Sequence, residues 1–195
     1  MSKISAWMAK VIETCSTIAP STSISNTWLI GHSLGSHMIG YTAKSLNKLT
    51  SKVEKLIGLD PAGPLFIKKF GGGKCQGIQK EYAIDTMVFL TNPGGLGTEN
   101  DKLAAVNVHV NLEKDYCQYR CQCNSSMCNH IYASTTLFGA LARREDLKGT
   151  YLADKEREPI HTVTIYKTMK PGVYAIESSK NPSLQQAKTH AYDEL

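Results

Sequence analysis

Residues 28–37 read Trp28-Leu29-Ile30-Gly31-His32-Ser33-Leu34-Gly35-Ser36-His37. An apolar run of strand-forming residues leads into the pattern Gly-x-Ser-x-Gly, and small or apolar residues then recur at helical spacing. The recurring residues are Leu34, Met38, Ile39, Thr42, Ala43 and Leu46. This stretch therefore predicts a strand, a sharp turn and a helix, with Ser33 at the tip of the turn.

The residue types around Ser33 suit an activated hydroxyl group. A serine is a poor nucleophile unless its hydroxyl is exposed beside a base, and a strained strand-to-helix turn exposes it. We interpret Gly31 and Gly35 as leaving room for backbone to pack against this turn. The N–H of Leu34 begins the helix, so it is predicted to donate to an oxyanion, where the helix dipole also favours negative charge. The alternative interpretation is a coincidental Gly/Ser turn.

Length and composition predict one domain with a sizeable core, because the chain has 195 residues of which 42% are hydrophobic. The net charge is +5, but the basic residues are scattered and no basic-aromatic pattern indicates a nucleic-acid partner. The charge is compatible with peripheral contact with an anionic membrane surface. No stretch approaches the length needed to span a membrane, so we expect no transmembrane segment.

Four of the six cysteines fall within one short polar stretch, namely Cys117, Cys121, Cys123 and Cys128. This clustering predicts disulfides and an oxidising compartment. A zinc cluster is the alternative, but the spacing lacks paired Cys-x2-Cys units, so we predict no metal site. The glycosylation sequon Asn124-Ser125-Ser126 is a second indication of secretion. We therefore expect an extracellular protein, although its pairing of cysteines stays open.

The first residues predict an amphipathic helix over 3–15 followed by a Ser/Thr loop, without the apolar segment of a secretory leader. Secreted-type cysteines without a leader lead us to expect that the N-terminal part of the domain is missing. The predicted domain covers 1–195, with a core over 1–177 and a polar, frayed tail over 178–195.

Strands and helices are predicted to alternate along the chain. We predict strands over 26–32, 53–59, 85–90 and 106–111, the last one short and half-exposed, and a helix that opens at Asn129-His130. Residues 71–73 and Cys75 are predicted to form a flexible loop. Residues 162–166 and 172–176 are predicted to form a hairpin or edge pair. The alternation indicates an α/β protein with a partial, mostly parallel sheet and flanking helices.

Two further residues complete a candidate triad with Ser33. Asp60 directly follows the predicted strand over 53–59, at the edge where open α/β sheets place their sites, although an Asp-Pro turn is the alternative. His130 follows the tethering Cys128 and opens a helix. His32 and His37 are too close to Ser33 in sequence to approach it from the opposite side, so we interpret them as packing or surface residues. The order serine, acid, histidine is that of α/β hydrolases.

Three segments resemble the animal pancreatic-lipase family, including its insect phospholipase A1 branch. They are Gly31-His32-Ser33-Leu34-Gly35, Gly58-Leu59-Asp60-Pro61-Ala62-Gly63-Pro64-Leu65-Phe66 and Cys128-Asn129-His130. The resemblance covers about residues 1–145 and implies the α/β-hydrolase fold. It implies that Ser33, Asp60 and His130 form the triad of a serine ester hydrolase that needs no cofactor, with Asp60 as the acid. Most other α/β hydrolases place the acid one strand later, where this chain has Asn92.

The resemblance also bears on the substrate. In the family, the lid lies in a loop closed by a disulfide to the cysteine two residues before the catalytic histidine, here Cys128. Pairing with Cys117, Cys121 or Cys123 would enclose at most residues 118–127. In this family short lids accompany phospholipase A1 activity and long lids accompany triglyceride lipases. Phospholipid at a lipid–water interface is therefore the expected substrate. A triacylglycerol lipase and a catalytically silent, yolk-type lipid-binding relative are the alternatives.

The family supplies its second oxyanion donor from a His-Gly loop well upstream of the serine, and residues 1–26 contain no such loop. Loss of one donor lowers the rate by about 10²–10³-fold. We therefore expect weak or no activity from this chain alone, together with an exposed sheet edge.

Overall fold

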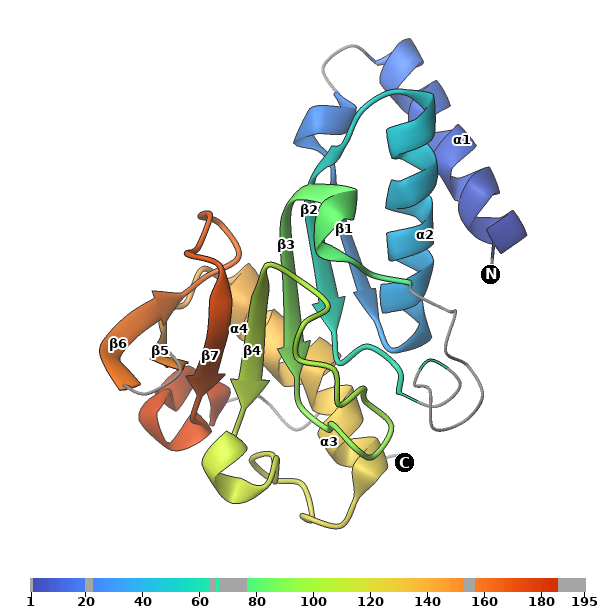
Figure 1. Ribbon diagram of the computed structural model, residues 1–195. Coiled ribbons are helices and arrows are strands. Elements are labelled where there is room, and N and C mark those ends of the chain that lie inside the picture. Colours follow the sequence, from blue (N-terminus) through green and yellow to red (C-terminus); the bar gives the residue numbers. More distant parts are fainter. Residues whose placement is uncertain (1, 20–22, 64–65, 67–76, 153–156, 186–195) are drawn as a thin grey trace.

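The computed structural model describes residues 2–19, 23–63, 66, 77–152 and 157–185, and Figure 1 shows a twisted sheet flanked by helices. The helices are α1 (Ser2–Ile18), α2 (Leu34–Leu49), α3 (Ser126–Tyr132) and α4 (Phe138–Ala142), with a π-helical turn over Ala133–Leu137 between the last two. The strands are β1 (Trp28–His32), β2 (Val53–Leu59), β3 (Ala83–Leu90), β4 (Val106–Val110), β5 (Leu147–Leu152), β6 (Arg157–Val163) and β7 (Gly172–Ile176). Among these helices, none combines the length and apolar character that crossing a membrane requires.

The strands form one sheet in the order β1-β2-β3-β4-β7-β5-β6. Neighbours from β1 through β4 to β7 are parallel, whereas β5 runs antiparallel to both β7 and β6. Among the described strands, β1 pairs with β2 alone and so lies at an edge. The predicted α/β class with a mostly parallel sheet is confirmed.

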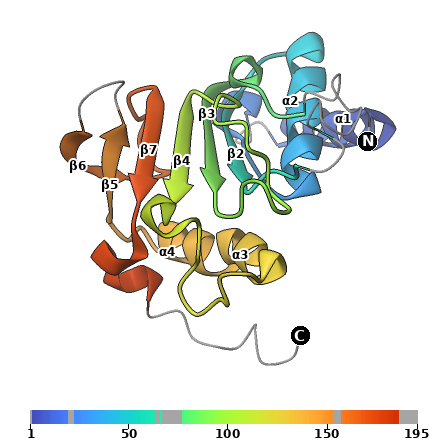
Figure 2. The ribbon, with the colours of Figure 1, turned by 60° about the horizontal axis from the view of Figure 1, so that its bottom comes forward.

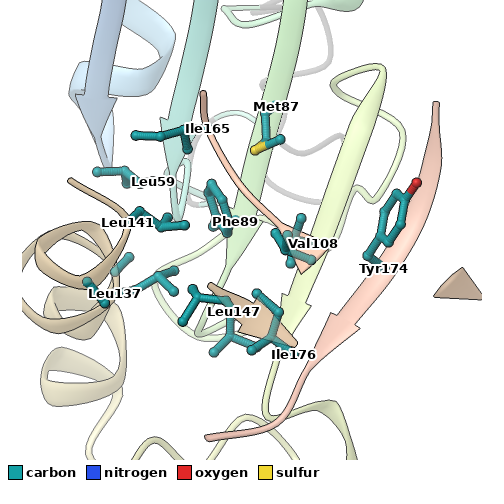
Figure 3. Packing of buried hydrophobic residues seen from close by; sticks show 14 of the residues in the cluster. Leu59, Met87, Phe89, Val108, Leu137, Leu141, Leu147, Ile165, Tyr174 and Ile176 are labelled. Atoms are coloured by element: carbon teal, nitrogen blue, oxygen red, sulfur yellow. The ribbon is translucent and has the colours of Figure 1, made fainter. Parts of the chain in front are cut away.

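Hydrophobic side chains cover both faces of the central strands. Ile57 and Leu59 of β2 pack towards α3 and α4, whereas Leu56, which directly precedes Ile57, packs towards α1 and α2. Figure 2 shows the two helix pairs on their separate faces. The buried residues on the face covered by α3 and α4 form one cluster, called the first cluster below. Besides Ile57 and Leu59 it contains Met87, Phe89, Val108, Leu137, Leu141, Leu147, Ile165, Tyr174 and Ile176 (Figure 3). Burial on both faces explains the nearly continuous apolar runs in these strands.

The predicted half-exposure of the strand over 106–111 is wrong. Strand β4 lies between β3 and β7, and all its residues except His109 are buried. Asn107 can be buried because its side chain accepts from Ala104 N–H at 3.2 Å and donates to Ala104 O at 2.8 Å. Local hydrogen bonds therefore satisfy a polar residue whose alternation suggested solvent contact.

The predicted pairing of the last two strands is also wrong, because β5 lies between β6 and β7. Strand β6 covers 157–163 rather than the expected 162–166. Gly149 in the middle of β5 obscured the strand pattern. A Cβ at this glycine would lie 2.6 Å from Val163 Cγ2, so close packing between β5 and β6 requires the absence of a side chain.

Residues 178–185 are packed, contrary to the frayed tail expected from their polarity. Leu184 has no exposed surface and belongs to the first cluster. The Asn181 side chain accepts from Lys148 N–H at 2.6 Å and donates to Lys148 O at 2.9 Å, which ties this segment to β5. Residues 186–195 and the predicted loop with residues 71–73 and Cys75 lie outside the described residues.

A buried ion pair links the sheet to the segment after β6. Lys55 Nζ of β2 lies 2.9 Å from Asp85 Oδ2 of β3, and the two side chains are only 3% and 6% exposed. The same ammonium group donates to Ile165 O at 2.6 Å and lies 5.0 Å from the centroid of the Trp28 ring. Lys55 thus joins two central strands to a distant segment of chain.

We predict that Lys55→Met destabilises the protein by about 3–5 kcal/mol, because it leaves the Asp85 charge buried without its partner. Adding Asp85→Leu should recover most of this loss. As a control, Lys10→Met removes an exposed pair with Glu13 and should change stability by at most about 1 kcal/mol. Denaturant unfolding of the four proteins gives these free energies. Equal values for Lys55→Met and Lys10→Met would contradict the prediction.

Candidate active site

Ser33 occupies the sharp turn between β1 and α2. Its φ of 54° and ψ of −123° are unusual for a residue other than glycine, and the strain is typical of a functional turn. The turn is anchored because Ser33 N–H donates to Leu59 O at 3.0 Å and Ser36 Oγ donates to Gly31 O at 2.7 Å. The predicted strand, turn and helix are therefore present, with Ser33 partly exposed and Leu34 51% exposed.

The two glycines of this motif differ in what they contribute. A Cβ on Gly31 would lie 2.5 Å from Gly35 O, so backbone approach excludes a side chain there. A Cβ on Gly35 would have no such neighbour within 4 Å. The expectation that backbone packs closely against the glycine is thus confirmed at Gly31. It is wrong at Gly35, because the backbone of Gly35 is what packs against Gly31.

Asp60 directly follows β2 and has no exposed surface. Its Oδ1 accepts from Thr91 N–H at 2.9 Å and from Asn92 N–H at 3.1 Å. Its Oδ2 lies 2.5 Å from His130 Nδ1. Since a buried carboxylate requires donors, the two backbone N–H groups and the imidazole together allow Asp60 to lie inside the protein.

Two supporting features of the Asp60 site were missed in the sequence. A Cβ on Gly97 would lie 2.5 Å from Asp60 Oδ1, so the glycine forms the wall against which the carboxylate packs. Asn92 uses its backbone N–H for Asp60 and its side chain to donate to Ser126 O at 2.9 Å. The sequence signal for these features was the Pro-Gly-Gly pattern after β3. It predicts a turn there, but it does not show that the turn faces Asp60.

His130 lies in α3, and a network of loop contacts holds this short helix. Disulfides join Cys117 to Cys123 and Cys121 to Cys128. The Ser125 side chain caps α3 by accepting from Cys128 N–H. This pairing supports the disulfide interpretation over the zinc alternative, because the four sulfurs are bonded to one another.

Gln118 and Asn129 complete this support, and neither was identified from the sequence. Gln118 is 1% exposed, and its Nε2 lies 2.8 Å from Thr91 O and 3.0 Å from Val110 O. Its N–H donates to Asn129 Oδ1 at 3.0 Å. The cysteine loop is therefore bonded to the residue that donates to Asp60 and to the residue that precedes His130.

The structure brings the predicted acid and base into direct contact, and the serine turn lies next to them. His32 precedes Ser33, and its ring centroid is 4.5 Å from that of His130. Within the described residues, no hydrogen bond joins Ser33 Oγ to His130. Catalytic hydrogen bonds are often long before substrate binds, so this geometry is compatible with a proton transfer between them.

His37 is a packing residue, as interpreted from the sequence. It is 2% exposed, donates from Nε2 to Ala62 O at 2.8 Å and stacks on Phe66 with 3.8 Å between ring centroids. Burial lowers the pKa of His37 below its usual value, so the neutral ring is favoured.

The sheet topology and the strained serine turn before α2 are those of the α/β-hydrolase fold. The family model described as Lipase matches residues 1–71. Residues 1–71 are therefore similar to this lipase family, and the similar proteins include phospholipases A1 of insects.

The relatives match over part of their length. "Phospholipase A1 2" of Polistes dominula is 33% identical over 130 residues, which are 65% of this chain and 38% of that protein. "Phospholipase A1" of Solenopsis invicta is 41% identical over 76 residues, which are 38% of this chain and 21% of that protein. "Phospholipase A1" of Vespula squamosa is 51% identical over 45 residues, which are 23% of this chain and 15% of that protein. This chain therefore spans well under half the length of these relatives.

We predict that Gly31→Ala and Gly35→Ala differ sharply in stability. The Gly31 substitution forces a methyl group against backbone and should cost about 1–3 kcal/mol or more, whereas the same methyl group at Gly35 enters open space. Alanine is also favoured over glycine within a helix, so Gly35→Ala should be neutral or stabilising by up to about 1 kcal/mol. Thermal unfolding measures both, and a Gly35→Ala protein that is as unstable as Gly31→Ala would refute this account.

Proposed function

We propose that this chain is a serine carboxylic ester hydrolase of the phospholipase A1 type, with Ser33 as nucleophile, His130 as general base and Asp60 as the acid that orients it. The observation that carries the proposal is the buried pair of His130 Nδ1 and Asp60 Oδ2, 2.5 Å apart, beside a strained serine turn. The names of the relatives support the reaction type.

The contact between His130 and Asp60 determines which nitrogen of the His130 ring acts as the base. Nδ1 of His130 is held by Asp60, so Nε2 is the nitrogen that takes the proton from Ser33 Oγ as the oxygen bonds to the ester carbonyl carbon. The imidazolium that forms is stabilised by the Asp60 carboxylate. When the tetrahedral intermediate collapses, His130 returns the proton to the departing alcohol oxygen. Water then attacks the acyl-serine by the same route and releases the fatty acid.

The start of α2 supports charge stabilisation during this reaction. Backbone N–H groups in the first turn of a helix lack acceptors within the helix, and the helix dipole favours an anion there. Leu34 N–H follows Ser33 in that turn and is the donor that we assign to the oxyanion.

Lipid is the substrate class that the site favours. The loop closed by Cys121 and Cys128 contains only residues 122–127. The family's association of short lids with phospholipase A1 therefore points to phospholipids. Leu34 is 51% exposed, and Tyr119 and Met127 of the cysteine loop and α3 are 40% and 57% exposed. These apolar groups suit contact with a lipid–water interface, and the disulfides suit an extracellular location.

We predict that a fluorophosphonate probe labels the full chain at Ser33, because His130 and Asp60 activate that hydroxyl. Labelling should be slow, by about 10²–10³-fold, since residues 1–26 contain no His-Gly loop to supply a second oxyanion donor. Peptide mass spectrometry locates the label. Ser33→Ala should abolish labelling, and Asp60→Asn should slow it by about 10⁴-fold. Ser45→Ala, which changes a serine on α2 away from the turn, is the matched control and should react like the unchanged chain.

Fatty-acid release from phosphatidylcholine and from a triglyceride identifies the substrate. Faster release from phosphatidylcholine supports the proposal, and faster release from the triglyceride would favour the lipase alternative. A folded chain that leaves Ser33 unlabelled would instead support the silent, lipid-binding alternative.

A further inference from the structure

His32 makes two separate contacts with the proposed base. Its ring lies against the His130 ring, with 4.5 Å between centroids and an angle of 42° between ring planes. Its Nε2 lies 3.0 Å from the main-chain oxygen of His130. A carbonyl oxygen only accepts, so Nε2 of His32 carries the proton in this bond.

The surroundings of His32 favour its neutral form. The ring is half-buried, and this burial is the main cause that lowers its pKa below the usual value. The hydrogen bond to the His130 carbonyl and the Asp60 carboxylate partly oppose this lowering of the His32 pKa, and the titratable ring of His130 adds to it. A neutral His32 can donate to the carbonyl without placing a second positive charge beside the imidazolium that forms during the reaction.

The bond to Asp60 fixes one atom of the His130 ring and leaves the ring able to pivot about that atom. A ring packed on the imidazole restricts this pivot, and a hydrogen bond to the His130 carbonyl restrains the backbone that carries it. His32 is covalently joined to Ser33, so the same residue links the position of the base to that of the nucleophile.

We propose that His32 is a positioning residue, which holds the His130 ring in register with Ser33 by donating to the His130 carbonyl and packing against the imidazole. This role rests on the proposed function, because it places the base for the nucleophile. It adds a residue that acts through His130 and takes no part in the proton transfer itself.

The role is tested with three substitutions in the full chain. His32→Ala removes both contacts, His32→Phe keeps a ring without a donor, and His32→Gln keeps a donor without a ring. His161→Phe is the matched control, since His161 lies on β6 towards the other end of the sheet. Circular dichroism establishes that each variant is folded.

The first measurement is the rate at which Ser33 reacts with the fluorophosphonate probe, together with kcat and KM for release of fatty acid from phosphatidylcholine. Displacing a reactive group by about 1 Å can lower the rate by about 10²-fold. We expect His32→Ala to lower the labelling rate and kcat by this factor with KM changed less than about twofold. His32→Phe and His32→Gln should each recover part of the loss, and His161→Phe should match the unchanged chain.

The second measurement does not require activity. The nuclear magnetic resonance signal of the His130 Nδ1 proton, assigned as the signal lost in His130→Gln, reports on the Asp60–His130 pair. In His32→Ala this proton should exchange with water at least tenfold faster. Suppose that the probe does not label Ser33, but that the His130 Nδ1 proton exchanges faster in His32→Ala. This result contradicts the proposed function and supports the positioning role. An unchanged signal and an unchanged labelling rate in His32→Ala would overturn the role. If that variant does not fold, unchanged values in both His32→Phe and His32→Gln would overturn it.

Discussion

The buried Asp60 carboxylate imposes the strongest constraint on this structure. A fully buried carboxylate is tolerated only where donors surround it, and here they come from Thr91, Asn92 and His130. These donors belong to the turn after β3 and to α3, so satisfying one side chain fixes the relative positions of three segments. Gly97 adds to the constraint, because any side chain there would occupy the space of the carboxylate.

The cysteine loop places α3 so that His130 can meet this requirement. Helix α3 continues through the π-helical turn into α4, and the contacts of its first residues with the cysteine loop set where His130 lies. The Cys121–Cys128 disulfide, the Ser125 cap and the bonds of Gln118 and Asn129 provide these contacts. The loop therefore serves the geometry of the base. In this arrangement His32 joins the serine turn to α3.

The central strands and the candidate triad could be predicted from local patterns. Apolar runs followed by Ser33 and Asp60 place both residues at the carboxyl edge of a parallel sheet, and the order of Ser33, Asp60 and His130 suits the fold. The sequence-based predictions of secondary structure were wrong where contacts with residues distant in the sequence determine the local structure. The pattern around Gly149 does not predict strand β5, because the reason for this glycine is its close contact with Val163. The polarity of the segment after residue 177 predicts a frayed tail, but the Asn181 side chain bonds to β5.

Periodicity and residue chemistry alone were enough to predict the α/β class and the sharp turn at Ser33. The order of Ser33, Asp60 and His130, together with the resemblance to the lipase family, was enough to select the residues proposed for catalysis. The pairing of the cysteines, the burial of Lys55 against Asp85 and the contact between the rings of His32 and His130 emerge only from the packed chain. These features depend on which side chains meet after the strands are ordered and the helices are packed. Spacing along the chain does not specify such meetings, because one pattern of apolar and polar residues is compatible with several strand orders.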